Sequence, residues 1–139
     1  MKKMNNKGFS LIELIIVIAI MAILVAIIAP NLTKYLGKSK KKTDAKNADE
    51  IAQQLQTAIT DYETDNGALC NDGDTVNITW ASGSAVSTPA NANFDTIVND
   101  NITNSTKSKE TGNAATATIE KASGKYTITV TVDNESTQR

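Results

Sequence analysis

The chain has 139 residues, a formal net charge of −1, 40% hydrophobic residues, no histidine and a single cysteine, Cys70. This length allows one small soluble domain plus a hydrophobic segment. The mild acidity argues against nucleic acid as the main partner, since phosphate binding needs a cationic face. The lack of histidine excludes Ser-His-Asp, Cys-His and histidine-metal sites, and one cysteine excludes an intramolecular disulfide. Cys70 is expected to be a small turn or core residue.

The basic residues before the first apolar stretch predict an unusual cleavage site. Lys2, Lys3 and Lys7 precede Gly8–Phe9, and the apolar run follows directly. A secretory signal is cut on the far side of its apolar region at an Ala-x-Ala-like site, which is missing here. Cleavage at Gly8–Phe9 would keep the apolar segment and create a new α-amine on Phe9.

The apolar stretch Phe9–Ala29 contains one acid, Glu13. As a helix rising about 1.5 Å per residue, the stretch is long enough to cross a hydrocarbon core of about 30 Å. A carboxylate within that core costs on the order of 3 kcal/mol, and the stretch contains no Lys, Arg or His to pair with it. The cationic Phe9 amine, four residues away, can neutralise this carboxylate.

The motif from Gly8 to Glu13, GFSLIE, followed by the aliphatic run and Pro30, resembles the class III signal of type IV pilins and pseudopilins. The resemblance covers about residues 7–35. It implies that a prepilin peptidase cuts after Gly8 and methylates Phe9. It also implies that Glu13 meets the N-terminal amine of a neighbouring subunit during assembly.

Two residues of the apolar run bear on its helical geometry. Pro30 has no amide hydrogen and crowds the carbonyl of Ala26, which predicts a kink. Many relatives carry a helix-weakening glycine midway along this helix, and this chain has Ala22 there. That substitution weakens the expectation of local unwinding before Pro30.

Small residues recur at spacings of three and four, which favours close helix packing or reflects the abundance of alanine in membrane helices; they are Ala19, Ala22, Ala26 and Ala29.

After Pro30 the pattern becomes amphipathic. Apolar residues fall at helical intervals; they are Ala48, Ile51, Ala52, Leu55, Ile59 and Tyr62. Asn66–Gly67 is a stop signal, so one helix is expected from about residue 9 to 65. Lys34, Lys38 and Lys41 share another face, which is either solvated near lipid headgroups or meets acidic patches of neighbouring subunits. Lysines flank both ends of the apolar run, so the family resemblance, rather than charge, implies a cytoplasmic N-terminus.

The remaining residues are rich in Thr, Asn and Ser and predict a small sheet. Strands are expected where apolar residues alternate with polar ones, at 76–80, 116–120 and 126–132, the last two forming a central hairpin. Other segments are expected as a loop (81–93), a short helix (94–102), a polar loop (104–113) and a frayed tail (133–139).

The predicted fold is therefore α+β, with one long helix packed on an antiparallel sheet of three or four strands. The predicted organisation has four parts: a leader (1–8), a transmembrane and assembly helix (9–33), its amphipathic continuation (34–65) and a β-rich head (66–139).

One weak cation site and no catalytic site emerge from the head. Asp72 and Asp74, around Gly73, supply oxygen ligands and a sharp turn but lack the later bidentate acid of an EF-hand. A simple turn is the favoured interpretation, so no metal and no cofactor are expected. No acidic pair indicates a catalytic cleft, and an enzyme is not expected.

Three functions fit these patterns to different degrees. The favoured one is the major subunit of a type IV pilus, cleaved by the prepilin peptidase and added to a helical homo-oligomer by the pilus assembly platform. The alternative is a pseudopilin of a type II secretion or DNA-uptake machine. A membrane-anchored binding domain is a third class, but Glu13 argues against it because a plain anchor has no use for a buried acid. The expected location is the cytoplasmic membrane before assembly and an extracellular pilus afterwards.

Overall fold

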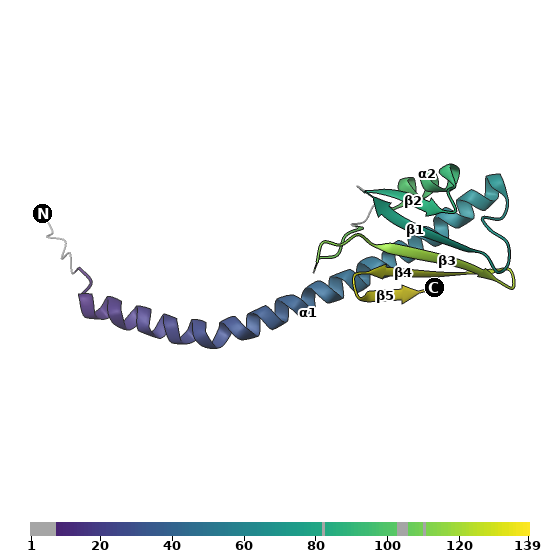
Figure 1. Ribbon diagram of the computed structural model, residues 1–139. Coiled ribbons are helices and arrows are strands. Elements are labelled where there is room, and N and C mark those ends of the chain that lie inside the picture. The colour runs from purple at the N-terminus through teal and green to yellow at the C-terminus, as the bar shows by residue number, and fades with distance from the viewer. Residues whose placement is uncertain (1–7, 82, 103–105, 110) are drawn as a thin grey trace, which may run out of the picture. The chain divides into compact units, whose positions relative to one another are not determined.

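The computed structural model describes residues 8–81, 83–102, 106–109 and 111–139. The chain forms two compact units, Met1–Lys38 and Ser39–Arg139. The leader lysines Lys2, Lys3 and Lys7 lie outside the described residues. Helix α1 (Leu11–Asn66) contributes its first part to the first unit and the rest to the second (Figure 1).

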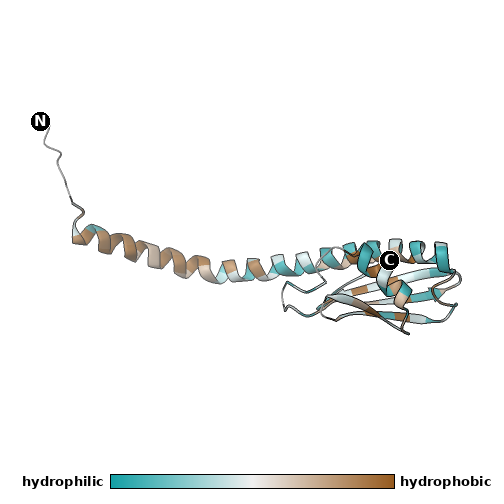
Figure 2. Ribbon diagram, turned by 90° about the horizontal axis from the view of Figure 1, so that it is seen from above, coloured by the Kyte–Doolittle hydropathy of each residue, from teal (hydrophilic) through white to brown (hydrophobic). Residues whose placement is uncertain are grey.

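In the first unit, α1 is an aliphatic helix that the chain itself leaves uncovered. None of the residues in its most hydrophobic 18-residue window is buried, and the window is long and apolar enough to cross a membrane. Figure 2 shows this stretch as the most hydrophobic part of the chain. Residues such as Leu14, Ile18 and Leu24 are all more than half exposed. Since apolar area on this scale is not left in water, the segment needs lipid or other helices around it.

In the second unit, α1 buries one face against the sheet. The buried residues follow the helical period; they are Asp44, Ala48, Ile51, Ala52, Leu55, Ala58 and Ile59. This confirms the predicted apolar face and adds one polar member, Asp44. The helix ends at Asn66, where Gly67 takes a left-handed φ of 81° that glycine adopts without steric cost. The predicted end at residue 65 is correct within one residue.

The sheet has five antiparallel strands in the order β2-β1-β3-β4-β5. They are β1 (Thr75–Ala81), β2 (Ser84–Thr88), β3 (Thr116–Ala122), β4 (Lys125–Val132) and β5 (Glu135–Gln138). Ile119 pairs with Ile128 and Ala117 with Val130, so the predicted hairpin forms the middle of the sheet. The α+β prediction is confirmed, but the expected three or four strands are one or two too few.

Strand β2 lies where a loop was predicted. Its inward residues are the apolar Ala85 and the polar Ser87, and its outward ones include Val86, so apolar and polar residues are mixed on both faces. Periodicity therefore gave no signal. The strand forms because β1 offers a free edge, which it joins from Asn77↔Thr88 to Ala81↔Ser84.

The C-terminal tail, predicted to be frayed, is the edge strand β5. It pairs with β4 after a turn in which Asp133 has a φ of 59°. Beyond the strand, Arg139 donates its backbone N–H to the carbonyl of Ile128 (2.8 Å) and accepts one from Ile128 (2.6 Å). Polar side chains hid this strand from sequence analysis, because its stability comes from backbone pairing with β4.

The short helix expected at 94–102 is confirmed as α2 (Ala92–Asn101). Asn91 caps it by accepting a hydrogen bond from the N–H of Phe94 (3.1 Å). Phe94 is fully buried, and its ring lies edge-on to Tyr62 with centroids 5.6 Å apart. Two α2 side chains accept hydrogen bonds from β2 backbone amides: Asn99 from Ala85 and Asp95 from Ser87, each at 2.8 Å. Helix α2 therefore covers one edge of the sheet.

Asp44 anchors the segment before β3 to α1. It is 1% exposed, and its carboxylate accepts hydrogen bonds from the Ser108 hydroxyl (2.7 Å) and the Lys109 backbone N–H (2.6 Å). These donors belong to the predicted polar loop 104–113, of which residues 104, 105 and 110 lie outside the described residues. Sequence analysis missed Asp44, because an acid among lysines is typical of an exposed helix face.

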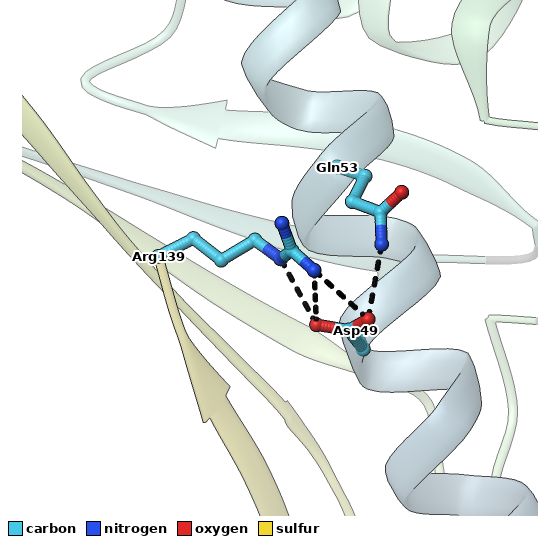
Figure 3. Close-up of polar contacts among 3 residues, drawn as sticks. All are labelled: Asp49, Gln53 and Arg139. Atoms are coloured by element: carbon cyan, nitrogen blue, oxygen red, sulfur yellow. Dashed lines mark hydrogen bonds and ion pairs between the residues drawn. The ribbon is translucent and has the colours of Figure 1, made fainter.

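The guanidinium of Arg139 holds the carboxylate of Asp49 on α1. The Nε and Nη2 atoms lie 2.9 and 3.0 Å from its two oxygens, and Gln53 donates a third hydrogen bond at 3.0 Å (Figure 3). This contact connects Arg139, the residue after β5, to α1. It therefore holds the C-terminal end of β5 near the helix. The hydrogen bond from Arg139 lowers the pKa of Asp49 below its usual range.

The Asp49 pair predicts an acid-sensitive contribution to stability. Because the pKa is lower in the folded state, this contribution is fully present above the unfolded value of about 3.9 and is lost as the pH falls through the folded pKa. The free energy of unfolding of the wild type should exceed that of Asp49→Asn near neutral pH, and the difference should shrink as the pH falls through the folded pKa. A difference that does not change with pH would contradict this role.

Candidate assembly site

The predicted cleavage site lies just before α1. Gly8 and Phe9 are exposed and non-helical, with 92% of Phe9 accessible. A Cβ built on Gly8 would meet nothing within 4 Å, and Gly8 is not among the residues with a left-handed φ. The described fold therefore does not require glycine at this position. A requirement for a small residue here would have to come from an enzyme that reads the junction.

Glu13 lies in the first turn of α1 and has a partner in its own chain. Its Oε2 accepts a hydrogen bond of 2.7 Å from the backbone N–H of Ser10. The Ser10 carbonyl accepts the bond from Leu14, which makes Ser10 the N-cap residue. Ser10-x-x-Glu13 is thus one half of a capping box. Sequence analysis searched for cationic partners and missed this one, although the spacing of serine and glutamate indicates it.

The Ser10 amide satisfies only one of the two carboxylate oxygens. Within the described residues no donor reaches Oε1 of Glu13. An ionised carboxylate accepts about four hydrogen bonds, so the second oxygen keeps its capacity for an additional donor.

Pro30 lies inside α1 and does not end it. Two side chains nearby bond to carbonyls of the same helix: Thr33 donates to Pro30 (3.0 Å) and Asn31 donates to Ile27 (3.4 Å). The helix also continues through Ala22 without a break. No local unwinding therefore occurs before Pro30, and the kink at Pro30 stays a prediction.

The apolar helix has a shallow groove between its larger side chains. Six residues line it: Met21, Leu24, Val25, Ile28, Ala29 and Leu32. Small residues such as Ala29 let apolar helices approach closely. The groove therefore offers a contact surface for the side chains of another apolar helix.

The acids proposed as a weak cation site take part in turns of the head. Asp72 accepts a hydrogen bond from the Gly124 N–H (3.1 Å), and Asp74 accepts two from Asn71 (both 3.2 Å). The described residues contain no group of three or more His, Cys, Asp and Glu that could hold a metal. The bond to Asp72 connects the 71–74 turn to the β3–β4 hairpin, and the two bonds to Asp74 lie within the turn.

Cys70 sits beside this turn. Its carbonyl accepts a hydrogen bond from the Lys121 ammonium (3.1 Å), and burial raises the pKa of its thiol. A raised pKa keeps the thiol protonated at neutral pH, which makes it a poor nucleophile. Nearby, the Tyr126 hydroxyl donates to Glu63 (2.5 Å) and accepts from the Leu69 N–H (3.2 Å), joining the end of α1 to β4.

The amino-terminal segment has a recognisable signal. Residues 3–29 match the family described as the prokaryotic N-terminal methylation motif. The chain carries the prepilin-type signal of the type IV pilin-like proteins. This family consists of structural pilin and pseudopilin subunits rather than enzymes. The signal, together with the apolar helix among the described residues, fits a membrane-anchored precursor.

Relatives from three kinds of machine resemble the chain. It is 35% identical to the type IV wide pilus major component PilA4 of Thermus thermophilus, over 67% of this chain and 65% of that one. It is 36% identical to the ComG operon protein 3 homolog of Bacillus licheniformis, over 45% and 61%. It is 35% identical to the type II secretion system core protein G of Klebsiella michiganensis, over 48% and 44%. The chain thus spans less than two thirds of these relatives, and no solved structure matches it significantly.

Proposed function

We propose that the chain is the major subunit of a type IV pilus, which polymerises through residues 9–33 after cleavage at Gly8–Phe9. The observation that carries this proposal is an apolar helix with no cover from its own chain and a half-satisfied carboxylate in its first turn. Lipid can cover the aliphatic side chains, but it offers no donor to Glu13. A neighbouring subunit offers both apolar helix surface and, after cleavage, the amine of Phe9.

Repeated head-to-tail addition through this helix gives a filament. One surface of each copy meets a different surface of the next, and such a contact extends without closing. In this arrangement Gly8 and Phe9 are the processing residues, and Glu13, Phe9 and Pro30 belong to the assembly helix. Residues 34–65 carry the head, 66–139, outside the apolar bundle. The pilus assembly platform in the membrane adds each subunit.

The extent of the sequence matches supports a pilin. The match to the wide pilus component covers 67% of this chain, whereas the matches to the ComG homolog and the secretion protein cover 45% and 48%. The longer match cannot be confined to the first 66 residues, so it includes part of the head. Each of the two shorter matches, by contrast, is about as long as the segment that ends with α1.

A pseudopilin of a secretion or DNA-uptake machine is the second candidate. The resemblance to the ComG homolog and to the type II secretion core protein favours it, at identities of 36% and 35% against 35% for the pilus relative. Electron microscopy of filaments sheared from the cell surface, with mass spectrometry of their main subunit, separates the candidates. Long surface filaments composed mainly of this chain support the pilin. Filaments that lack it, with the chain retained in the envelope, support the pseudopilin.

Processing gives a direct prediction. Gly8→Leu is expected to abolish cleavage and leave the precursor in the membrane, because the enzyme must accommodate the side chain before the cut. The surroundings of Gly8 are open, so the variant is expected to fold normally. Intact mass spectrometry of the extracted protein distinguishes a methylated chain beginning at Phe9 from the precursor.

The matched control for this experiment is Gly37→Leu. Gly37 also has open surroundings but lies within α1, away from the junction. Its cleavage should equal that of the wild type. Assembled filaments of wild-type chains that still contain residues 1–8 would contradict the proposed processing.

A further inference from the structure

Charges are strongly segregated along this chain. Residues 34–46 contain six lysines and one acid, Asp44, which is buried against its own head. Residues 47–106 contain nine acids and no Lys or Arg. The overall charge is only −1, so the separation gives two regions of opposite charge in a chain that is almost neutral overall.

The cationic side of this separation is an exposed part of α1 in the second unit. Lys40, Lys41 and Lys42, here called the lysine segment, are all exposed. No acid among the described residues forms an ion pair with them, whereas Lys46, one turn later, pairs with Glu50 at 3.2 Å. The described part of the head therefore forms no ion pair that compensates these three ammonium groups.

The acidic side lies near the other end of the same unit. Asp61 and Asp65 are exposed on α1 with the i,i+4 spacing at which like charges destabilise a helix. Asn101 of α2 donates a hydrogen bond to Asp61 (3.2 Å), which brings the exposed Asp100 to the same region. Asp61, Asp65 and Asp100 form the acidic patch. No Lys or Arg among the described residues forms an ion pair with it.

The two surfaces cannot compensate each other within one molecule. Lys42 and Asp61 are 19 residues apart in α1, which is about 28 Å along the axis at about 1.5 Å per residue. The Debye length is about 8 Å at physiological ionic strength, so their mutual attraction is screened. Compensation by oppositely charged side chains therefore requires another protein chain, and the two surfaces carry the same number of charges of opposite sign.

We propose that the lysine segment of one subunit docks on the acidic patch of a second copy of this chain. The proposal rests on the proposed function, because a filament supplies the repeated contact that brings two copies into axial offset. Charge complementarity across the contact fixes its register and disfavours wrong offsets, in which like charges would meet. Anionic lipid headgroups would also attract the lysine segment, but they would repel the acidic patch. A second copy accounts for both surfaces.

Charge reversal tests the contact in cells that make this chain as their sole subunit. Lys41→Glu/Lys42→Glu is expected to lower the filament yield at least tenfold, and Asp61→Lys/Asp65→Lys should do the same, since each places like charges together. The chain carrying all four substitutions should recover to within about threefold of wild type, since the pairs are restored with opposite sign. The control is Lys125→Glu, a charge reversal at an exposed lysine at the start of β4, which should assemble normally.

A cross-link tests whether the two surfaces actually meet. In a Cys70→Ser background, Lys41→Cys/Asp61→Cys is expected to form disulfide-linked ladders in intact filaments under mild oxidation. Each single-cysteine chain should give no ladder. The same double variant dissolved as monomers in detergent should stay unlinked, because the two positions of one chain are too far apart.

The outcomes separate this proposal from the function on which it rests. Absence of wild-type filaments would overturn both. Two results would overturn the docking alone. One is a normal filament yield in both charge-reversal variants. The other is a chain with all four substitutions that does not recover its filament yield, together with a double-cysteine variant that gives no cross-linked ladder. If Lys41→Glu/Lys42→Glu loses binding to vesicles rich in anionic lipid while its filament yield is unchanged, lipid headgroups are the ligand of the lysine segment. That result would overturn the contact between copies.

Discussion

Glu13→Gln is expected to give subunits that are cleaved, inserted and folded but enter filaments at least tenfold less often than wild-type subunits do. Glutamine keeps an oxygen that can accept the Ser10 N–H, so the start of α1 is preserved. It loses the negative charge that the Phe9 amine of a neighbour requires. Leaving a buried charge unpaired costs about 3–5 kcal/mol, and a tenfold change needs only about 1.4 kcal/mol.

Two comparisons make this prediction specific. Glu13→Ala removes both the charge and the capping oxygen, so it should assemble no better than Glu13→Gln. Glu120→Gln makes the same chemical change on the exposed outer face of β3 and should assemble normally. Incorporation is measured by mass spectrometry of filaments from cells that make wild-type and variant chains together. Glu13→Ala filaments of normal length and yield would show that the acid is not an assembly determinant.

The second large effect concerns the head. A chain without residues 1–33 is expected to be a soluble, folded monomer, since the exposed aliphatic side chains lie almost entirely in the removed part. In this fragment Phe94→Ala should lower the free energy of unfolding by about 3–5 kcal/mol. The Phe94 side chain of α2 is fully buried and packs against Tyr62 of α1. Its removal leaves a cavity between the two helices.

Thr96→Ala is the matched control, because Thr96 lies on the exposed side of α2 and bonds only within its own helix. Its effect should stay within about 0.5 kcal/mol. Urea unfolding followed by circular dichroism gives both values. A fragment with no cooperative transition, or with helical signal alone, would mean that the head depends on the removed segment.

The sequence by itself determined the features that depend on repeating patterns of many residues. The apolar run was visible because every residue from Leu14 to Ala29 avoids charge, and no tertiary contact is needed to make that helix span a membrane. The face of α1 containing Ile51 and Leu55 and the hairpin at Ile119 and Ile128 repeat with periods of about 3.6 and 2. The GFSLIE motif was recognised from the sequence because its six residues are consecutive, so no tertiary contact is needed to bring them together.

The tertiary structure decided the features in which a residue takes its role from a partner in another element of the fold. Ser87 is buried in a strand because β1 offers an edge and Asp95 accepts its amide hydrogen. Asp44 is buried because the Ser108 hydroxyl and the Lys109 amide, more than 60 residues away, satisfy its oxygens. Arg139 is ordered because Ile128 and Asp49 hold it. Hydrogen bonds between residues of different elements leave no period in the sequence, so only the folded chain brings their partners together.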